Sequence, residues 1–106
     1  MAKFLVKASY SAEGARGLMK EGGTGRRTAV QKAAQSLGGT IEAFYYGFGD
    51  TDAYVICDFP DAVSGMALSL AANATGAVHV STIPLITCEE IDAAIKKTAT
   101  YRAPGA

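Results

Sequence analysis

The sequence predicts an α+β fold in which one antiparallel sheet carries helices on a single face. Segments with the alternating hydrophobicity of strands and segments with the spacing of helices follow one another in the order β-α-β-β-α-β-α. The turn sequence Gly49-Asp50-Thr51-Asp52 separates two strand-like segments and therefore predicts a hairpin. The first six segments match the split βαβ arrangement of ferredoxin-like domains, with one helix added at the C-terminus. At 106 residues, the chain is expected to form a single domain over residues 1–106.

The first part of the chain predicts one strand and a broken helix. Residues 4–9 alternate between the two faces of a half-buried strand. Ser11 is a suitable N-cap for the next helix, because its side chain can accept a hydrogen bond from a free backbone N–H. Glycines crowd residues 21–25, where each destabilises a helix by about 1 kcal/mol relative to alanine, so we expect a break there. A second helix is predicted from about Arg26 to Gly38-Gly39, a typical helix C-terminus.

The two strands of the hairpin are predicted at residues 40–48 and 53–59. The first of them is rich in aromatic side chains, which favour sheet. Alternation predicts that its side chains lie on two faces, with Ile41, Ala43 and Tyr45 opposed to Glu42, Phe44, Tyr46 and Phe48. Aromatic side chains at this spacing are typical of a core or an interface, and a pocket for a planar apolar ligand needs the same lining.

The last three predicted elements are a helix, a strand and a helix. Pro60-Asp61 begins the helix, and its narrow face of small residues is formed by Ala62, Met66, Leu70, Ala71 and Ala72. Residues 77–83 form the fourth strand, which Pro84 is expected to end because proline has no N–H for a sheet ladder. Thr87 and Glu90 have the spacing of a capping box, which predicts a final helix up to about Thr98.

The alternation also divides the sheet into two faces. The face expected beneath the helices is apolar and carries Phe4, Val6, Ala8, Val55, Cys57, Val78 and Val80. The opposite face mixes apolar with polar residues and carries Leu5, Lys7, Ser9, Tyr54, Ile56, Asp58, His79, Ser81 and Ile83. A monomer is more usually polar on such a face, so we expect it to be buried in a homodimer or a larger homo-oligomer. Within this face, Lys7 and Asp58 are predicted to pair across strands.

Composition and charge exclude several classes of partner. Ten Lys and Arg balance ten Asp and Glu, so the chain lacks the basic character of a nucleic-acid-binding protein. No apolar run approaches the roughly 18 residues of a membrane span, and Lys7 comes too early for a signal peptide.

Cys57 and Cys88 have neither metal nor disulfide spacing, and we expect free thiols in the cytoplasm. No cofactor is predicted.

The segment Gly22-Gly23-Thr24-Gly25-Arg26-Arg27 is the clearest candidate for ligand binding. It leads into a predicted helix N-terminus, where free N–H groups and the helix dipole favour an anion. The two arginines are placed to clamp a carboxylate or a phosphate. The candidate ligand-binding residues are therefore Gly23, Gly25, Arg26 and Arg27. Alternatively, the glycines merely allow the helix to turn, while the arginines are solvated or pair with Glu21 or Glu42.

His79 is the only histidine of the sequence, and its ordinary pKa suits proton transfer near neutrality. It is expected in the middle of the fourth strand, where it could act as a base together with Tyr46 or Asp58. His79 and Tyr46 are therefore the candidate catalytic residues, and a structural histidine at an interface is the alternative. Asp50 and Asp52 are too few hard ligands for a metal ion, so no metal site is predicted.

Several short stretches together carry a resemblance to a known family: Ala8-Ser9-Tyr10-Ser11, Gly22-Gly23-Thr24-Gly25-Arg26-Arg27, Leu37-Gly38-Gly39, Phe44-Tyr45-Tyr46-Gly47-Phe48-Gly49 and Asp52. From Lys3 to Gly105 the chain resembles the GYD-domain family of small proteins. The Gly-x-Tyr-Asp motif that names the family reads Gly49-Asp50-Thr51-Asp52 here, so Thr51 stands in place of the tyrosine. The resemblance implies a ferredoxin-like fold similar to the dimeric α/β-barrel proteins, and it implies no settled activity.

Three functions fit these features. The first is the binding of a small anionic or aromatic ligand between sheet and helices or at an interface, with Arg26 and Arg27 at its anionic end. The second is a cofactor-free enzyme, monooxygenase-like or isomerase-like, in which His79 and Tyr46 transfer protons. The third is a structural or partner-binding module without catalysis. The glycine-arginine segment and the aromatic strand favour the first, whereas the fold alone supports all three.

Overall fold

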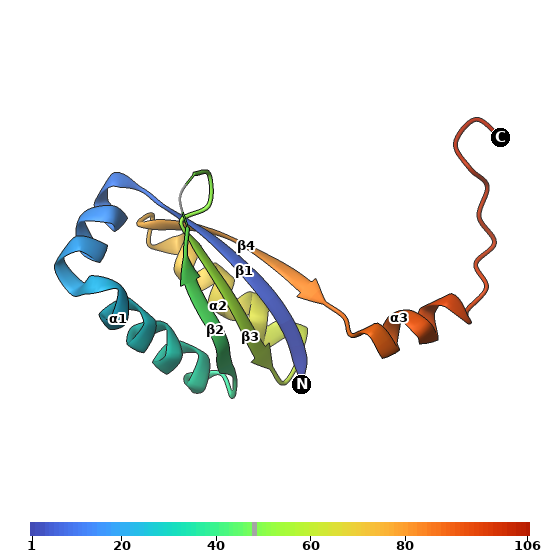
Figure 1. Ribbon diagram of the computed structural model, residues 1–106, viewed down its shortest axis with the longest axis horizontal. Coiled ribbons are helices and arrows are strands. Elements are labelled where there is room, and N and C mark those ends of the chain that lie inside the picture. The colour runs from blue at the N-terminus through green and yellow to red at the C-terminus, as the bar shows by residue number, and fades with distance from the viewer. Residues whose placement is uncertain (48) are drawn as a thin grey trace.

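The computed structural model describes residues 1–47 and 49–106; Phe48, at the end of the predicted second strand, lies outside them. The elements follow in the order β1 (Ala2–Tyr10), α1 (Ala12–Ser36), β2 (Thr40–Tyr46), β3 (Ala53–Phe59), α2 (Ala62–Ala74), β4 (Val78–Leu85) and α3 (Cys88–Ile95). The strands form one antiparallel sheet in the order β2-β3-β1-β4 (Figure 1). The predicted ferredoxin-like α+β fold is confirmed.

The faces predicted for β1, β3 and β4 are confirmed by the burial of their side chains. The core beneath the helices contains two clusters of buried residues, namely Phe4, Ala34, Cys57 and Phe59 in one and Ala8, Ala53 and Val80 in the other, and Val55 is buried as well. In the first cluster the rings of Phe4 and Phe59 pack at a centroid distance of 6.1 Å. Strict alternation sufficed for these strands because they pair without an irregularity.

Strand β2 departs from strict alternation. Its register with β3 shifts between Ile41 and Ala43, as a β-bulge does by adding one residue to one strand. Ile41 and Phe44 therefore both pack against the core, although they are three positions apart. Tyr46 shares their face, and Tyr45 lies on the opposite one. The prediction that Ile41 shares a face with Ala43 and Tyr45 is wrong for this reason.

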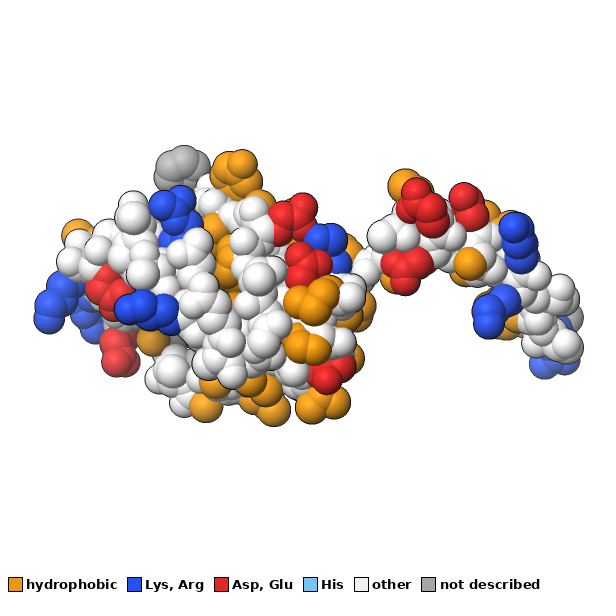
Figure 2. Space-filling view, turned by 90° about the horizontal axis from the view of Figure 1, so that it is seen from below, with side chains coloured by type: hydrophobic (Ala, Val, Ile, Leu, Met, Phe, Trp, Pro, Cys, Tyr) orange, Lys and Arg blue, Asp and Glu red, His pale blue; other side chains and the backbone are white. Residues whose placement is uncertain are grey.

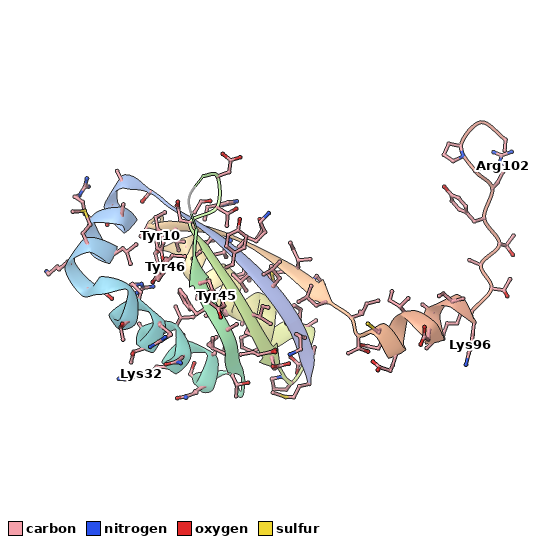
Figure 3. All side chains as sticks on the ribbon, in the orientation of Figure 1. Tyr10, Lys32, Tyr45, Tyr46, Lys96 and Arg102 are labelled. Carbon is pink, nitrogen blue, oxygen red and sulfur yellow. The ribbon has the colours of Figure 1, made fainter. Side chains whose placement is uncertain are left out.

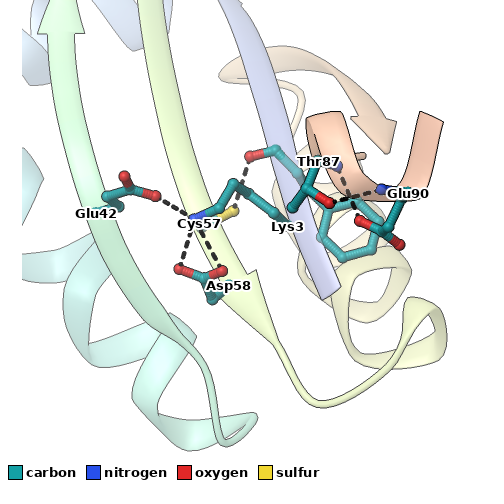
Figure 4. A network of polar contacts seen from close by, with 7 residues as sticks. Lys3, Glu42, Cys57, Asp58, Thr87 and Glu90 are labelled. Atoms are coloured by element: carbon teal, nitrogen blue, oxygen red, sulfur yellow. Dashed lines mark hydrogen bonds and ion pairs between the residues drawn. The ribbon is translucent and has the colours of Figure 1, made fainter. Parts of the chain in front are cut away.

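The open face of the sheet, which no helix covers, has its ion pair at Lys3 rather than Lys7. The register places Lys3 opposite Asp58 and Lys7 opposite Tyr54, so the predicted pair between Lys7 and Asp58 is wrong. Lys3 Nζ lies 3.0 Å from Asp58 Oδ1 and also donates to Glu42 (Figure 4). The hydrogen bonds to Glu42 and then to Asp58 raise the pKa of Lys3 above its ordinary 10.5.

Helix α1 is kinked at one residue. Gly22 has φ 80° and ψ 162° between two helical stretches, a conformation that glycine adopts readily because it has no Cβ. The predicted break is thus confirmed, but the second stretch begins directly after Gly22 instead of at Arg26. It ends at Ser36 with Leu37 as the C-cap, whose N–H donates to Ala34 O, and Gly38 follows with φ 76°, as predicted for a helix C-terminus.

Helix α2 turns an unexpected side to the sheet. Gly65 and Ser69 are its buried residues, whereas Met66 and Leu70 are exposed. Of the predicted small-residue face, Ala72 packs against the core, whereas the other members, Ala62, Met66, Leu70 and Ala71, are exposed. Gly65 is buried because α2 lies against Phe4 there, where an added Cβ would stand only 3.1 Å from the phenylalanine ring.

The chain after β4, residues 86–106, extends away from the sheet (Figure 1), and we call it the α3 arm. β4 continues through Pro84 to Leu85, so the predicted end at Pro84 is wrong; an edge strand tolerates proline because its outer side needs no donor. The predicted capping box is confirmed, with Thr87 Oγ1 accepting from Glu90 N at 3.1 Å (Figure 4). Helix α3 ends at Ile95 rather than near Thr98 and projects away from the body (Figure 2). None of the helices described is long and apolar enough to cross a membrane.

Candidate functional site

A cavity lies between the helix-covered face of the sheet and helices α1 and α2. We call this space of about 80 Å³ the inner cavity. Most of its wall is apolar and comes from all four strands and both helices, through Val6, Ala8, Val30, Phe44, Ala53, Val55, Leu68, Ala72, Val78 and Val80. The polar side chains that reach it are Tyr10, Arg26, Ser69 and Thr82. An apolar space with a few polar groups is typical of a small-molecule site.

The inner cavity exists because small side chains meet at one place. Ala8 and Ala53 are opposite each other in β1 and β3, and Ala72 packs against them from α2. Larger side chains would fill this volume, since protein interiors are normally packed without voids.

The kink of α1 is held by a contact with β2. The Tyr46 hydroxyl donates to Gly23 O at 3.1 Å, on the first residue after the kink. A Cβ on Gly23 would stand 3.1 Å from the Tyr46 ring, so this close approach requires a residue without a large side chain. Tyr46 also lies beside Tyr10, the last residue of β1 (Figure 3). The kink therefore fixes where the second half of α1 passes over the sheet.

Arg26 stands one turn after the kink, where two spaces meet. It lines the inner cavity and also a groove of about 300 Å³, which we call the outer groove. Tyr10, Ala72 and Val78 line both spaces as well, so the outer groove continues into the inner cavity. The guanidinium Nη1 of Arg26 lies 3.5 Å from Glu21 Oε2, the pairing considered as the alternative to an anion site. The structure thus puts a cation at the mouth of an apolar space.

Arg27 points to a different place. It lines a surface groove beside β2, together with Thr28, Gln31, Glu42 and Tyr45, and does not line the inner cavity. Adjacent helix residues are about 100° apart around the axis, which separates the two guanidinium groups. The structure therefore does not bring Arg26 and Arg27 to one anion. Gly23 and Gly25 lie in the helix after the kink, with Gly23 against Tyr46 and Gly25 against Glu21.

His79 and Tyr46 are not brought together. His79 is opposite Ser9 on the open face of the sheet, in edge strand β4. Tyr46 is opposite Ala53, on the covered face and in the other edge strand, β2. Burial, followed by the neighbouring Tyr10, raises the pKa of Tyr46 above its ordinary 10.0, so its phenol is neutral near pH 7. Tyr46 is therefore suited to donate a hydrogen bond, as it does to Gly23.

The motif residues Gly49 and Asp52 lie in the connection between β2 and β3. Gly49 has φ 116°, a left-handed conformation that favours glycine. Asp52 Oδ2 accepts from the backbone N–H of Tyr10 at 2.8 Å, and Asp52 N donates to Ala8 O at 2.8 Å. Asp52 thus anchors the end of β1, where Tyr10 borders the inner cavity. Among the residues described, no three His, Cys, Asp or Glu side chains gather as a metal site would require.

Three polar residues of the inner cavity, Tyr10, Ser69 and Thr82, are not among the predicted site residues. Tyr10 ends β1, one residue beyond the strand predicted at residues 4–9. Thr82 continues the apolar alternation of Val78 and Val80, and a hydroxyl in that position is the signal that could have singled it out. Recognising Tyr10 or Thr82 as a cavity residue requires knowing which strands are neighbours.

One of three comparisons with known proteins identifies a family. The model of the GYD domain matches residues 4–95, which is most of the chain. No curated protein and no solved structure matches the sequence. The match includes the kinked helix, Asp52 and every strand residue that lines the inner cavity. The chain belongs to the GYD-domain family.

Proposed function

We propose that the protein binds a small amphipathic molecule, with an apolar and preferably aromatic body in the inner cavity and an anionic group at Arg26. The observation that carries this proposal is the position of Arg26 at the junction of the apolar inner cavity and the outer groove. Phe44 and Tyr10 add aromatic walls. Aromatic rings prefer edge-to-face or offset contacts, and an aromatic ligand can make such contacts with Phe44 and Tyr10.

The charge of Arg26 supplies orientation. A guanidinium is planar and always protonated, and it binds a carboxylate through two parallel hydrogen bonds. In the structure Glu21 occupies it at 3.5 Å, and both side chains are partly exposed. Exposed ion pairs contribute about 0–1 kcal/mol, so a ligand carboxylate can displace Glu21 at small cost. The apolar body then enters the inner cavity while the charge stays at its mouth.

The test is a titration with 3-phenylpropanoate and its neutral analogue 3-phenylpropan-1-ol, followed by calorimetry. We expect the acid to bind about tenfold more tightly than the alcohol, as one charge-assisted hydrogen-bond pair would give. Arg26→Gln should remove this difference. Arg27→Gln is the matched control, because it removes the same charge from the next residue on a different side of the helix. Equal losses in both variants, or no binding of the acid, would contradict the proposal.

The catalytic alternative finds less support. A proton-transfer pair must reach one substrate, and His79 and Tyr46 lie on opposite faces and opposite edges of the sheet. The separate positions of His79 and Tyr46 therefore favour ligand binding over catalysis by these two residues.

We also propose that the protein forms a homodimer through the open face of its sheet. Tyr45, Tyr54 and Ile83 are exposed there by 71%, 41% and 41%, and Leu5 and Ile56 lie between them. The charged residues at one end of this face, Lys3, Asp58 and Glu42, pair with one another within the chain. An isologous contact would cover the same face on both copies.

Sedimentation of Ile83→Glu tests the dimer. The carboxylate would be placed in the proposed contact and should shift the particle from two chains to one. Val63→Glu is the control, since Val63 is an equally apolar, exposed residue on α2 at the other side of the sheet. A wild-type protein that sediments as one chain at micromolar concentration would contradict the proposal.

The two thiols suit a reducing compartment. Cys57 and Cys88 are both free, one buried in β3 and the other exposed on the α3 arm. Since disulfides are rare in the cytosol, we place the protein in the cytoplasm.

A further inference from the structure

One residue of the inner cavity wall, Thr82, carries a buried hydroxyl without a partner. Among buried side-chain nitrogen and oxygen atoms of residues 1–47 and 49–106, Thr82 Oγ1 alone makes no hydrogen bond. Thr82 lies opposite Val6 on the covered face, and both line the inner cavity. Burying a hydroxyl without a partner is unfavourable, and a valine has the same shape without that cost. In the ligand-free protein, the Thr82 hydroxyl therefore has no hydrogen-bond partner that would offset the cost of its burial.

Thr82 lies deeper in the site than Arg26. Val78 of β4 lines both the inner cavity and the outer groove, whereas Thr82 lines the inner cavity alone. Val78 and Thr82 are four positions apart in β4 and therefore roughly 13 Å apart, because a strand rises about 3.3 Å per residue. A cation at the mouth and a hydroxyl at the inner end thus border one apolar space. Ser69, a buried residue of α2, adds a second hydroxyl to its wall.

We propose that the ligand is an aromatic monocarboxylate with a hydroxyl group at the end opposite its carboxylate. This inference rests on the ligand-binding function proposed above and adds the chemistry of the ligand's inner end. The carboxylate binds Arg26, the ring fills the space beside Phe44, and the distal hydroxyl forms a hydrogen bond with Thr82 Oγ1. A threonine hydroxyl can both donate and accept, so it matches a phenol or an alcohol.

The size of the inner cavity agrees with one ring. Its volume of about 80 Å³ is well below the roughly 300–1,000 Å³ of sites for drug-sized ligands. A nucleotide or a fused-ring cofactor is therefore too large, whereas a phenyl ring on a short acid chain is of the right class.

The test compares 3-(4-hydroxyphenyl)propanoate with 3-phenylpropanoate on the full chain by calorimetry. Wild type should bind the hydroxylated acid about tenfold more tightly, the effect of one satisfied buried hydrogen bond. Thr82→Val should abolish this preference and leave the dissociation constant of 3-phenylpropanoate within about twofold. Thr82→Ser keeps the hydroxyl and should retain the preference. Melting curves of each variant establish that it is folded.

Each outcome bears on a different proposal. If wild type binds both acids equally, or if Thr82→Val keeps the preference, the inference about the inner end is overturned while the proposed function stands. If neither acid binds wild type, both proposals are overturned. If Thr82→Val equalises the two acids and Arg26→Gln weakens both, the two ends of the site act as described.

Discussion

Asp52 Oδ2 accepts a hydrogen bond from the backbone N–H of Tyr10 at 2.8 Å, and so joins the β2–β3 connection to the end of β1. Tyr10 lines both the inner cavity and the outer groove, so the carboxylate that ends the family motif supports the mouth of the site. Ser9 adds a second link of the same kind, because its hydroxyl donates to Asp50 O at 2.6 Å.

Removing the Asp52 carboxylate should destabilise the protein. Asp52→Ala leaves the partly buried N–H of Tyr10 without its acceptor, and hydrogen bonds to charged groups are worth about 1.5–3 kcal/mol. We expect a loss of about 2 kcal/mol in urea unfolding. Asp50→Ala, at an exposed position of the same connection, should change the stability by less than about 0.5 kcal/mol. Equal effects of both changes would argue against the anchoring role of Asp52.

The same substitution should have opposite effects at two threonines. Thr82→Val removes a hydroxyl that has no partner, so the ligand-free protein should be unchanged or more stable by up to about 1 kcal/mol. Thr75→Val removes a hydroxyl that donates to Ala72 O at 2.8 Å and accepts from Ala77 N at 3.2 Å, and should cost about 1 kcal/mol. Thermal unfolding of the two variants measures the difference. A clear loss of stability in Thr82→Val would mean that its hydroxyl is satisfied within the chain.

The two thiols should differ in reactivity. Burial raises the pKa of Cys57 to about 11, and its Sγ contacts Phe4 O at 3.8 Å. Near pH 8 it is therefore both protonated and inaccessible, whereas Cys88 is exposed on the α3 arm. A disulfide reagent should modify one thiol per native chain at once and the second only after unfolding. Mass spectrometry of the first product should locate the label on Cys88; early labelling of Cys57 would contradict the burial described.

The N-cap of α2 should make stability depend on acid pH. The backbone N–H of Ser64 and then its hydroxyl lower the pKa of Asp61 below its ordinary 3.8. Because the folded-state pKa is the lower one, the stabilisation is present above about pH 4 and is lost as pH falls through the folded-state pKa. Asp61→Asn keeps the capping acceptor without a charge that titrates. Between pH 6 and pH 3, wild type should therefore lose more stability than Asp61→Asn in urea unfolding; parallel losses would count against the cap.

Most of the fold could be predicted because β1, β3 and β4 alternate regularly. The bulge after Ile41 could not, since nothing in the local pattern marks the extra residue. The register between β1 and β3 also determines which lysine pairs with Asp58. Lys3 and Lys7 lie on the same face of β1, so only the alignment with β3 distinguishes them. The order of elements is thus local information, whereas pairing depends on the assembled sheet.

The site could be predicted in part. The glycine-rich surroundings of Arg26 predict a ligand-binding residue there, and a pocket between sheet and helices is one of the predicted positions for a site. The separation of Arg26 from Arg27 follows from the early restart of α1 after Gly22, which the glycine count alone would not suggest. The sequence did not show that His79 and Tyr46 lie in opposite edge strands, nor which side of β2 faces the helices, because both depend on strand pairing.

The α3 arm makes a single chain elongated in solution. The radius of gyration is 16.6 Å, compared with about 13 Å for a compact domain of this length. Ile91 and Ile95 on the arm are exposed by 45% and 75%, so the extension also carries apolar surface into solvent. A single chain should scatter X-rays at small angles as an elongated particle with a long tail in its distance distribution. Two chains that cover each other's arms would lose that tail, which makes the shape of the particle a readout of assembly independent of its mass.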